Sequence, residues 1–173
     1  MRLFSKNWLA PVMFYLCCGQ AYASKVDYLI PVGTSYCGYV DDFSEKLNIN
    51  DYVVHFQFLL HTWIFSEYLL GVSKNGKYYV IAYSKTNYNA ESIELIPADP
   101  EAITSSAVLI SKLLDSSYNW SHDGKFVEIN SATDGADRIY VYQNDNCGYT
   151  FMNHNLGPNT QELINNYNSY RRQ

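Results

Sequence analysis

Charged residues are scarce in this sequence, and basic residues are the scarcer kind. Charged side chains make up 17% of the 173 residues, against about 25% in ordinary globular domains. The chain has 12 Lys and Arg against 17 Asp and Glu, which gives a formal net charge of −5. Because contacts with phosphate groups require many basic side chains, this balance excludes a nucleic-acid-binding protein and a protein held to anionic lipids by charge.

The N-terminal apolar run is too short for a comfortable membrane span, which needs about 20 residues. This run, Trp8 to Cys18, follows Arg2 and Lys6 and precedes the small-x-small pattern Ala21-Tyr22-Ala23. Such an arrangement is typical of a secretory signal peptide, although a retained anchor is the alternative. We expect residues 1–23 to be cleaved and residues 24–173 to form one exported domain, periplasmic or secreted, without a stable membrane anchor. Loss of Arg2 and Lys6 takes the net charge from −5 to −7.

Cysteine is also rare. Two of the four cysteines, Cys17 and Cys18, lie in the predicted leader, which leaves Cys37 and Cys147 in the mature chain. In an oxidising compartment such a pair favours one disulfide, with two unpaired thiols as the alternative. The bond would close a loop of roughly 110 residues and would stabilise the fold by up to about 4–5 kcal/mol on chain-entropy grounds.

No motif in the sequence assembles a familiar active site. A nucleophile elbow, a zinc-protease helix and a phosphate-binding glycine loop are absent, and the histidines have no metal-ligand spacing. Glu67, Glu94 and Glu128 are the residues from which a pair of glycosidase carboxylates would come, but only their acidity selects them. The sequence therefore favours a protein that is not an enzyme and that holds no metal and no cofactor.

Alternating apolar residues and turn signals predict a sheet. Val54, Phe56, Phe58 and Leu60 recur with period two, as in a strand with one apolar face. Asn75-Gly76 between two apolar runs predicts a hairpin, because both residues tolerate positive φ. The strands expected on these grounds begin near Tyr52 and continue at 67–73, 77–84, 91–96, 125–130, 138–143 and 148–153.

Two segments have helical signals. Asp99 can cap a helix at about 99–117, Pro100 fits its first turn, and an apolar stripe follows. A second helix at about 159–170 would bury Leu163, Ile164 and Tyr167. Together these elements predict a single α+β domain, mainly an antiparallel sheet of about 6–7 strands with two packed helices.

One segment of the chain is similar to a known repeat. Trp120-Ser121-His122-Asp123-Gly124-Lys125, followed by Asp137-Arg138-Ile139-Tyr140-Val141, resembles one blade of the propeller repeats in the periplasmic component of the Tol system. His122 departs from the pattern, where proline is usual. The mature chain would hold about three such blades, whereas a propeller needs about four or more. We interpret the likeness as convergence of turns between strands and expect no propeller.

Aromatic residues are abundant, with 17 Tyr and 3 Trp. Such side chains join a large apolar area to a polar tip, which suits recognition surfaces. Packing between neighbouring strands is the alternative use. We place Trp120, His122 and Asp123 at a turn between a helix and a strand. The residues expected to form a binding surface are Trp63, Trp120, His122, Asp123, Tyr140 and Tyr142.

Export, small size, acidic charge and many tyrosines favour an exported, non-enzymatic protein that binds another macromolecule. An envelope inhibitor, or an immunity protein that neutralises a toxin or hydrolase, fits this description. We expect a protein partner of basic charge, because opposite charges steer association. A small-ligand or glycan-binding module is one alternative, and a secreted hydrolase or effector of unfamiliar type is another.

Overall fold

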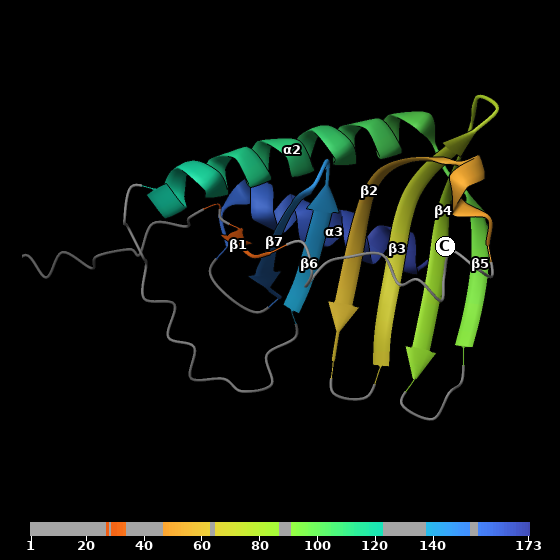
Figure 1. Cartoon of the computed structure of the whole chain (residues 1–173), viewed down its shortest axis with the longest axis horizontal. Helices are drawn as coiled ribbons and strands as arrows, with labels where there is room; N and C mark the ends of the chain where they lie inside the picture. The colour runs from red at the N-terminus through yellow and green to blue at the C-terminus, as the bar shows by residue number, and fades with distance from the viewer. Residues whose placement is uncertain are drawn as a thin grey trace, which may run out of the picture.

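The chain folds into one antiparallel sheet with two long helices against one of its faces (Figure 1). The computed structural model describes residues 27, 29–33, 47–62, 65–86, 91–122, 138–152 and 156–173. Every strand pairing in this part of the chain is antiparallel. The predicted α+β fold is confirmed, and the described strands form a single continuous sheet rather than the blades of a propeller.

Four strands follow one another as a meander: β2 (Val53–His61), β3 (Phe65–Lys74), β4 (Lys77–Thr86) and β5 (Glu91–Pro97). A short 3-10 helix, η2 (Ile49–Asp51), precedes them. The chain then returns to the other side of β2 with β6 (Arg138–Gln143) and β7 (Asn146–Phe151), and β1 (Ile30–Pro31) pairs with β7. The order of the described strands is β1-β7-β6-β2-β3-β4-β5, so β5 is the last of them on one side of the sheet. The predicted strand at 125–130 lies outside the described residues.

The two hairpin turns whose residues are all described, β3–β4 and β6–β7, use left-handed backbone. Asn75 and Gly76, between β3 and β4, have φ values of 52° and 74°, which confirms the predicted turn. Asn144 and Asp145, between β6 and β7, have φ values of 49° and 61° and adopt the same kind of conformation.

The helices begin where the sequence predicts. Asp99 accepts a hydrogen bond from the backbone N–H of Glu101 at 2.9 Å, at the start of α2 (Pro100–His122). The predicted end near residue 117 is wrong, because no Gly or Pro stops the helix before Gly124. Trp120 and His122 therefore belong to the last turn of α2 instead of a turn between helix and strand. The second helix is α3 (Pro158–Arg171).

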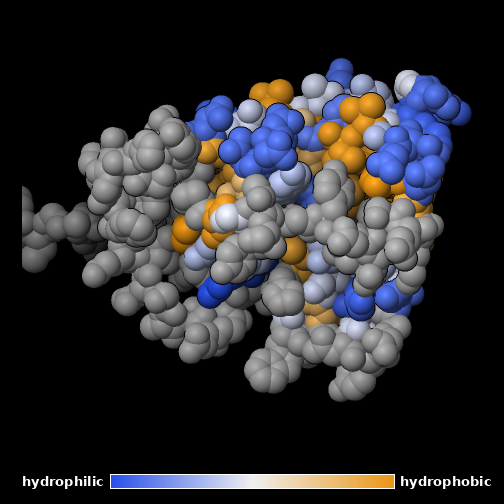
Figure 2. All heavy atoms as spheres, viewed as in Figure 1, coloured by the Kyte–Doolittle hydropathy of each residue, from blue (hydrophilic) through white to orange (hydrophobic). Residues whose placement is uncertain are grey.

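The main core lies between the sheet and both helices, and in Figure 1 α3 lies behind the strands. Leu163, Ile164 and Tyr167 of α3 are buried there, as predicted. A smaller cluster on the opposite face of the sheet contains Ile49, Leu70, Val72, Ile81 and Tyr83. Hydrophilic side chains gather over η2 and the β3–β4 hairpin at one corner of the molecule (Figure 2). Neither described helix carries an apolar stretch long enough to cross a membrane.

Candidate functional site

The sheet face that carries the helices changes from apolar to polar where α3 ends. The register places Glu67 of β3 beside Ser84 of β4, and Ser84 beside Ser92 of β5. The next row on the same face is Leu69, Ala82 and Glu94. Because α3 ends at Arg171, the helix covers these two rows only in part. Polar side chains on this face of the sheet therefore remain accessible to water.

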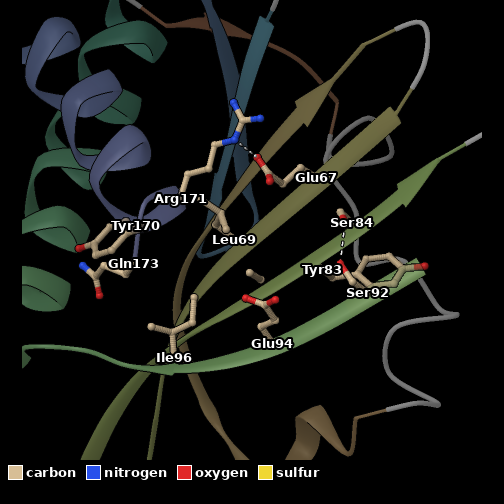
Figure 3. A pocket seen from close by; sticks show the side chains of 11 residues that line it. Glu67, Leu69, Tyr83, Ser84, Ser92, Glu94, Ile96, Tyr170, Arg171 and Gln173 are labelled. Carbon is tan, nitrogen blue, oxygen red and sulfur yellow. Dashed lines mark hydrogen bonds and ion pairs between the residues drawn. The ribbon is translucent and has the colours of Figure 1, made fainter. Parts of the chain in front are cut away.

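A cavity of about 160 Å³ lies between these strands and the last turn of α3. Leu69, Ala82 and Ile96 give it apolar walls. Figure 3 shows Glu67 beside Arg171, to which a dashed line joins it, whereas the ring of Tyr83 points away from both. The polar side chains that line the cavity are those of Glu67, Ser84, Ser92, Glu94, Tyr170, Arg171 and Gln173.

Glu67 is the most enclosed carboxylate of this cavity, with 15% of its side chain exposed. The hydroxyl of Tyr167 donates a hydrogen bond to Glu67 Oε2 at 2.5 Å. The Nε atom of Arg171 lies 3.4 Å from the same oxygen. The second oxygen, Oε1, has no hydrogen bond from the described residues, so it can accept one from a ligand.

Glu94 is the exposed carboxylate of the cavity. It forms no hydrogen bond or ion pair with any described residue. The hydroxyls of Ser84 and Ser92 lie 2.8 Å apart beside it and can each donate or accept. The side chains around the cavity therefore include two carboxylates against one guanidinium, and this excess of negative charge favours a cationic ligand.

Tyr170 forms the wall of the cavity on the side of α3. Burial raises the pKa of its hydroxyl above the ordinary value, and the hydrogen bond with Ser106 opposes this rise. The protonated hydroxyl donates to the carbonyl oxygen of Ala102 at 2.8 Å and lies 2.8 Å from Ser106 Oγ. These contacts tie the end of α3 to α2, and so fix the wall from which Arg171 extends.

The residues predicted to form a binding surface are not brought to this cavity. Trp63 and Asp123 lie outside the described residues, and Trp120 and His122 are placed only as part of α2. Tyr140 and Tyr142 lie on β6, on the face opposite the helices. The ring of Tyr140 packs against that of Tyr149, with centroids 5.4 Å apart. The hydroxyl of Tyr142 donates a hydrogen bond to Asp145 Oδ1 at 2.9 Å. Both tyrosines thus contact neighbours within the β6–β7 hairpin.

The disulfide between Cys37 and Cys147 stays a prediction. Cys147 is buried in β7, in the row of Tyr142. Cys37 lies outside the described residues.

A serine and a histidine meet at the other end of the helix-covered face. His55 Nε2 lies 2.9 Å from Ser73 Oγ, and the His55 ring stacks on Tyr78 with centroids 5.6 Å apart. Among the described residues no carboxylate contacts the His55 ring, so these residues supply no third member of a catalytic triad.

The pH dependence of stability should contain a contribution from His55. Burial lowers the pKa of His55 below its ordinary value of 6.5, so the unfolded chain takes up a proton more readily than the folded one. The contribution of neutral His55 to the free energy of unfolding is then fully present above about pH 6.5 and is lost as the pH falls through the lowered pKa. Urea unfolding gives the free energy of unfolding at about pH 7.5 and pH 5.5. The difference between these two values should be smaller for His55→Gln than for the unaltered chain. An NMR titration midpoint of the His55 ring at or above 6.5 would contradict this.

Part of the cavity could be foreseen from the sequence. Two of the three glutamates considered for a carboxylate pair, Glu67 and Glu94, do line one cavity, whereas Glu128 lies outside the described residues. The roles of Arg171, Ser84 and Ser92 had no local signal, because only strand register and helix placement bring them together.

Metal binding finds no support in the described part of the chain, which holds no group of three or more His, Cys, Asp or Glu side chains arranged to ligate an ion. Comparison with family models, with curated proteins and with solved structures finds no match to the chain.

Proposed function

We propose that this chain is an exported, non-enzymatic protein that binds a basic protein partner, and that the cavity at the end of α3 receives an Arg or Lys side chain of that partner. An envelope inhibitor or an immunity protein, acting on a basic toxin or hydrolase, is the form of this function that we favour. The observation that carries the proposal is the excess of carboxylates over guanidinium around one small cavity.

The volume of the cavity supports a single side chain as its occupant. At about 160 Å³, it is close in size to an engineered cavity of about 150 Å³ that accommodates benzene. Sites for larger ligands are usually about 300 Å³ or more. One guanidinium or ammonium group with its aliphatic stem fits this space, whereas an oligosaccharide exceeds it.

The chemistry of the lining supports a cation. A guanidinium can donate to both oxygens of a carboxylate, and such charge-assisted hydrogen bonds are roughly twice as strong as neutral ones. Glu94 and the Oε1 atom of Glu67 supply acceptors, the two serine hydroxyls supply further ones, and Leu69 and Ile96 can contact the stem. Basic anchors buried in such pockets are frequent hot spots of protein interfaces. The acidic charge of the whole chain would steer a basic partner toward the site.

Binding of N-acetyl-arginine methylamide tests the proposal most directly. We expect a dissociation constant on the order of 1 mM for this single-residue probe, measured by NMR titration of the mature chain. Its uncharged isostere, N-acetyl-citrulline methylamide, should bind much more weakly. Glu94→Gln should weaken arginine binding by about threefold to tenfold, because it removes the exposed charge.

Glu91→Gln is the matched control for Glu94→Gln. Glu91 is on the same strand, but it is paired with Lys85 at 3.8 Å and does not line the cavity. We expect this variant to bind the arginine probe as the unaltered chain does. Equal binding of the arginine and citrulline probes, or preferential binding of chitotriose at the same residues, would overturn the proposal.

A further inference from the structure

The strand β5 presents a long, regular backbone edge. It pairs with β4 without interruption from Lys85↔Glu91 to Tyr79↔Pro97, and it is the last strand of the sheet (Figure 1). Among the described residues no backbone hydrogen bond is made by the outer side of β5. The opposite end of the sheet is β1, which has only two residues. A long edge of this kind can accept another strand.

Most of the features that protect edge strands are missing from β5. It has no lysine and no bulge, and its proline, Pro97, is its last residue. Its two charges are acidic, from Glu91 and Glu94. Leu95 points to the opposite face from Glu94 and is 44% exposed. The edge therefore combines acidic and apolar side chains on its two faces.

The charges of β5 argue against a second copy of this chain as the added strand. Two-fold antiparallel pairing about the centre of β5 would place Glu94 directly opposite the Glu94 of the other copy. Like charges directly opposite each other destabilise a strand pair. A strand with basic side chains is attracted to β5 instead, because its charge is complementary to that of Glu91 and Glu94.

The edge and the cavity are continuous, since Ser92 and Glu94 of β5 line the cavity. A strand added to β5 would lie about 4.8 Å beyond it. The residue opposite Glu94 would have its Cβ about 5 Å from that of Glu94, on the same face. A long basic side chain at this position can therefore reach the cavity, while its two sequence neighbours lie on the other face, beside Ile93 and Leu95.

We propose, building on the function proposed above, that the basic partner binds by adding an extended segment to β5. One Arg or Lys of this segment lies opposite Glu94 and enters the cavity, and the apolar residues on either side of it contact Leu95 and Ile93. The specificity of the site is then for an apolar-basic-apolar sequence in β conformation. Backbone pairing supplies part of the affinity, and the cavity selects the basic residue.

A synthetic peptide tests this proposal. The probe is acetyl-Ser-Thr-Val-Arg-Val-Thr-Ser-amide, titrated into the mature chain. We expect it to bind at least about tenfold more tightly than N-acetyl-arginine methylamide, because several backbone hydrogen bonds add to the contact of the side chain. Hydrogen exchange of amides in Glu91–Ile96 should slow in its presence.

Two further peptides carry a single N-methyl group, one on the Arg nitrogen and one on the nitrogen of the Val that follows it. Neighbouring amides of a strand point to opposite sides, so one N-methyl group faces β5 and the other faces solvent. We expect one of these peptides to lose about tenfold or more in affinity and the other to lose little. Equal affinities, or binding no tighter than that of the single-residue probe, would overturn strand addition.

The controls separate this proposal from the one on which it rests. A peptide with citrulline in place of arginine should bind about threefold to tenfold more weakly if the cavity holds the cation. Loss of affinity on citrulline substitution, with equal affinities for the N-methylated peptides, would leave the cavity as the site and remove strand addition. Unchanged affinity on citrulline substitution would remove the cavity as the site.

Discussion

Replacing Gly71 by Ala should destabilise the fold by about 2–3 kcal/mol, a large effect for one added methyl group. Gly71 lies on β3, opposite Phe56 of β2. A Cβ at this position would meet Cε1 and Cζ of the Phe56 ring at distances of 2.4 Å and 2.5 Å. Only the absence of a side chain therefore lets the ring lie against the backbone of β3.

The Phe56 ring has little room to move away. It is 1% exposed and packs edge-on against Phe58, with centroids 5.2 Å apart. The centroid of the Tyr170 ring lies 5.9 Å from that of Phe56. Because these neighbours are themselves in the close-packed core, the strain of an added Cβ cannot be relieved by a small rotation.

A double-mutant cycle distinguishes this clash from a general sensitivity of β3. Phe56→Leu removes ring atoms and should cost about 1–1.5 kcal/mol alone. In that background Gly71→Ala should cost less than about 1 kcal/mol, so that the coupling energy is about 1.5 kcal/mol or more. Urea unfolding of the four proteins gives these values. A cost of Gly71→Ala that is equal in both backgrounds would show that the contact with Phe56 is not its cause.

Local signals were sufficient for the predicted turns and helix starts. The Asn75-Gly76 turn and the cap at Asp99 depend on one or two residues and on backbone within a few positions, so both could be predicted. Asn144-Asp145 forms the same kind of turn but lacks glycine, so its sequence does not give the usual hairpin signal. A pair of non-glycine residues at positive φ carries a conformational cost that only the surrounding hairpin offsets.

The strand β2 shows where period-two reasoning fails. Phe56, Phe58 and Leu60 share the helix-covered face, as the alternation predicts. Val54 instead packs with the cluster on the opposite face, because a bulge shifts the register between Val54 and Phe56. One inserted residue reverses the faces of everything before it, and no composition signal marks the position.

Pairings between distant segments could not be predicted at all. No local pattern in the sequence indicates that β6 pairs with β2, or that α3 ends beside Glu67. The candidate cavity depends on both kinds of long-range placement. Its two acidic residues, Glu67 and Glu94, could be named from the sequence, but their place in one cavity follows only from the register of β3, β4 and β5 and from the end of α3.

Replacing Asp27 by Ala should also destabilise the fold by about 2–3 kcal/mol, although Asp27 is only four residues into the predicted mature chain. Its Oδ1 atom accepts a hydrogen bond from the backbone N–H of Thr160 at 2.9 Å, and its Oδ2 atom accepts one from the side chain of Asn159 at 2.6 Å. Asp27 thus caps α3 from a position more than 130 residues away in the sequence. Gly157, the N-cap residue of α3, has no side chain that could accept these hydrogen bonds.

Two variants locate the effect in this cap. Asp27→Asn keeps one acceptor oxygen but loses the charge that favours a helix N-terminus, and should cost about 1 kcal/mol. Gly157→Ala would place a Cβ 2.4 Å from Asp27 Oδ1 and 2.5 Å from its backbone nitrogen, so it should displace Asp27 from the helix. Because both changes remove the same cap, Gly157→Ala combined with Asp27→Ala should cost clearly less than the sum of the two.

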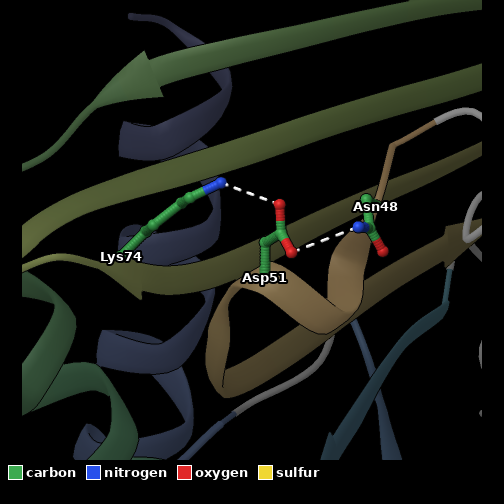
Figure 4. A network of polar contacts seen from close by, with 3 residues as sticks. All are labelled: Asn48, Asp51 and Lys74. Atoms are coloured by element: carbon green, nitrogen blue, oxygen red, sulfur yellow. Dashed lines mark hydrogen bonds and ion pairs between the residues drawn. The ribbon is translucent and has the colours of Figure 1, made fainter.

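Asp51 offers a matched acidic control. It bonds to Asn48 at 3.1 Å and pairs with Lys74 at 2.9 Å (Figure 4), but the side chains of this ion pair are 47% and 36% exposed. Asp51→Ala should therefore change stability by no more than about 0.5–1 kcal/mol. Urea unfolding of residues 24–173, the predicted mature chain, measures all of these variants on one scale. If Asp27→Ala is no more harmful than Asp51→Ala, the cap does not hold α3. If Asp27→Ala is clearly more harmful, the N-terminal end of α3 is held in part by Asp27, a carboxylate near the beginning of the predicted mature chain.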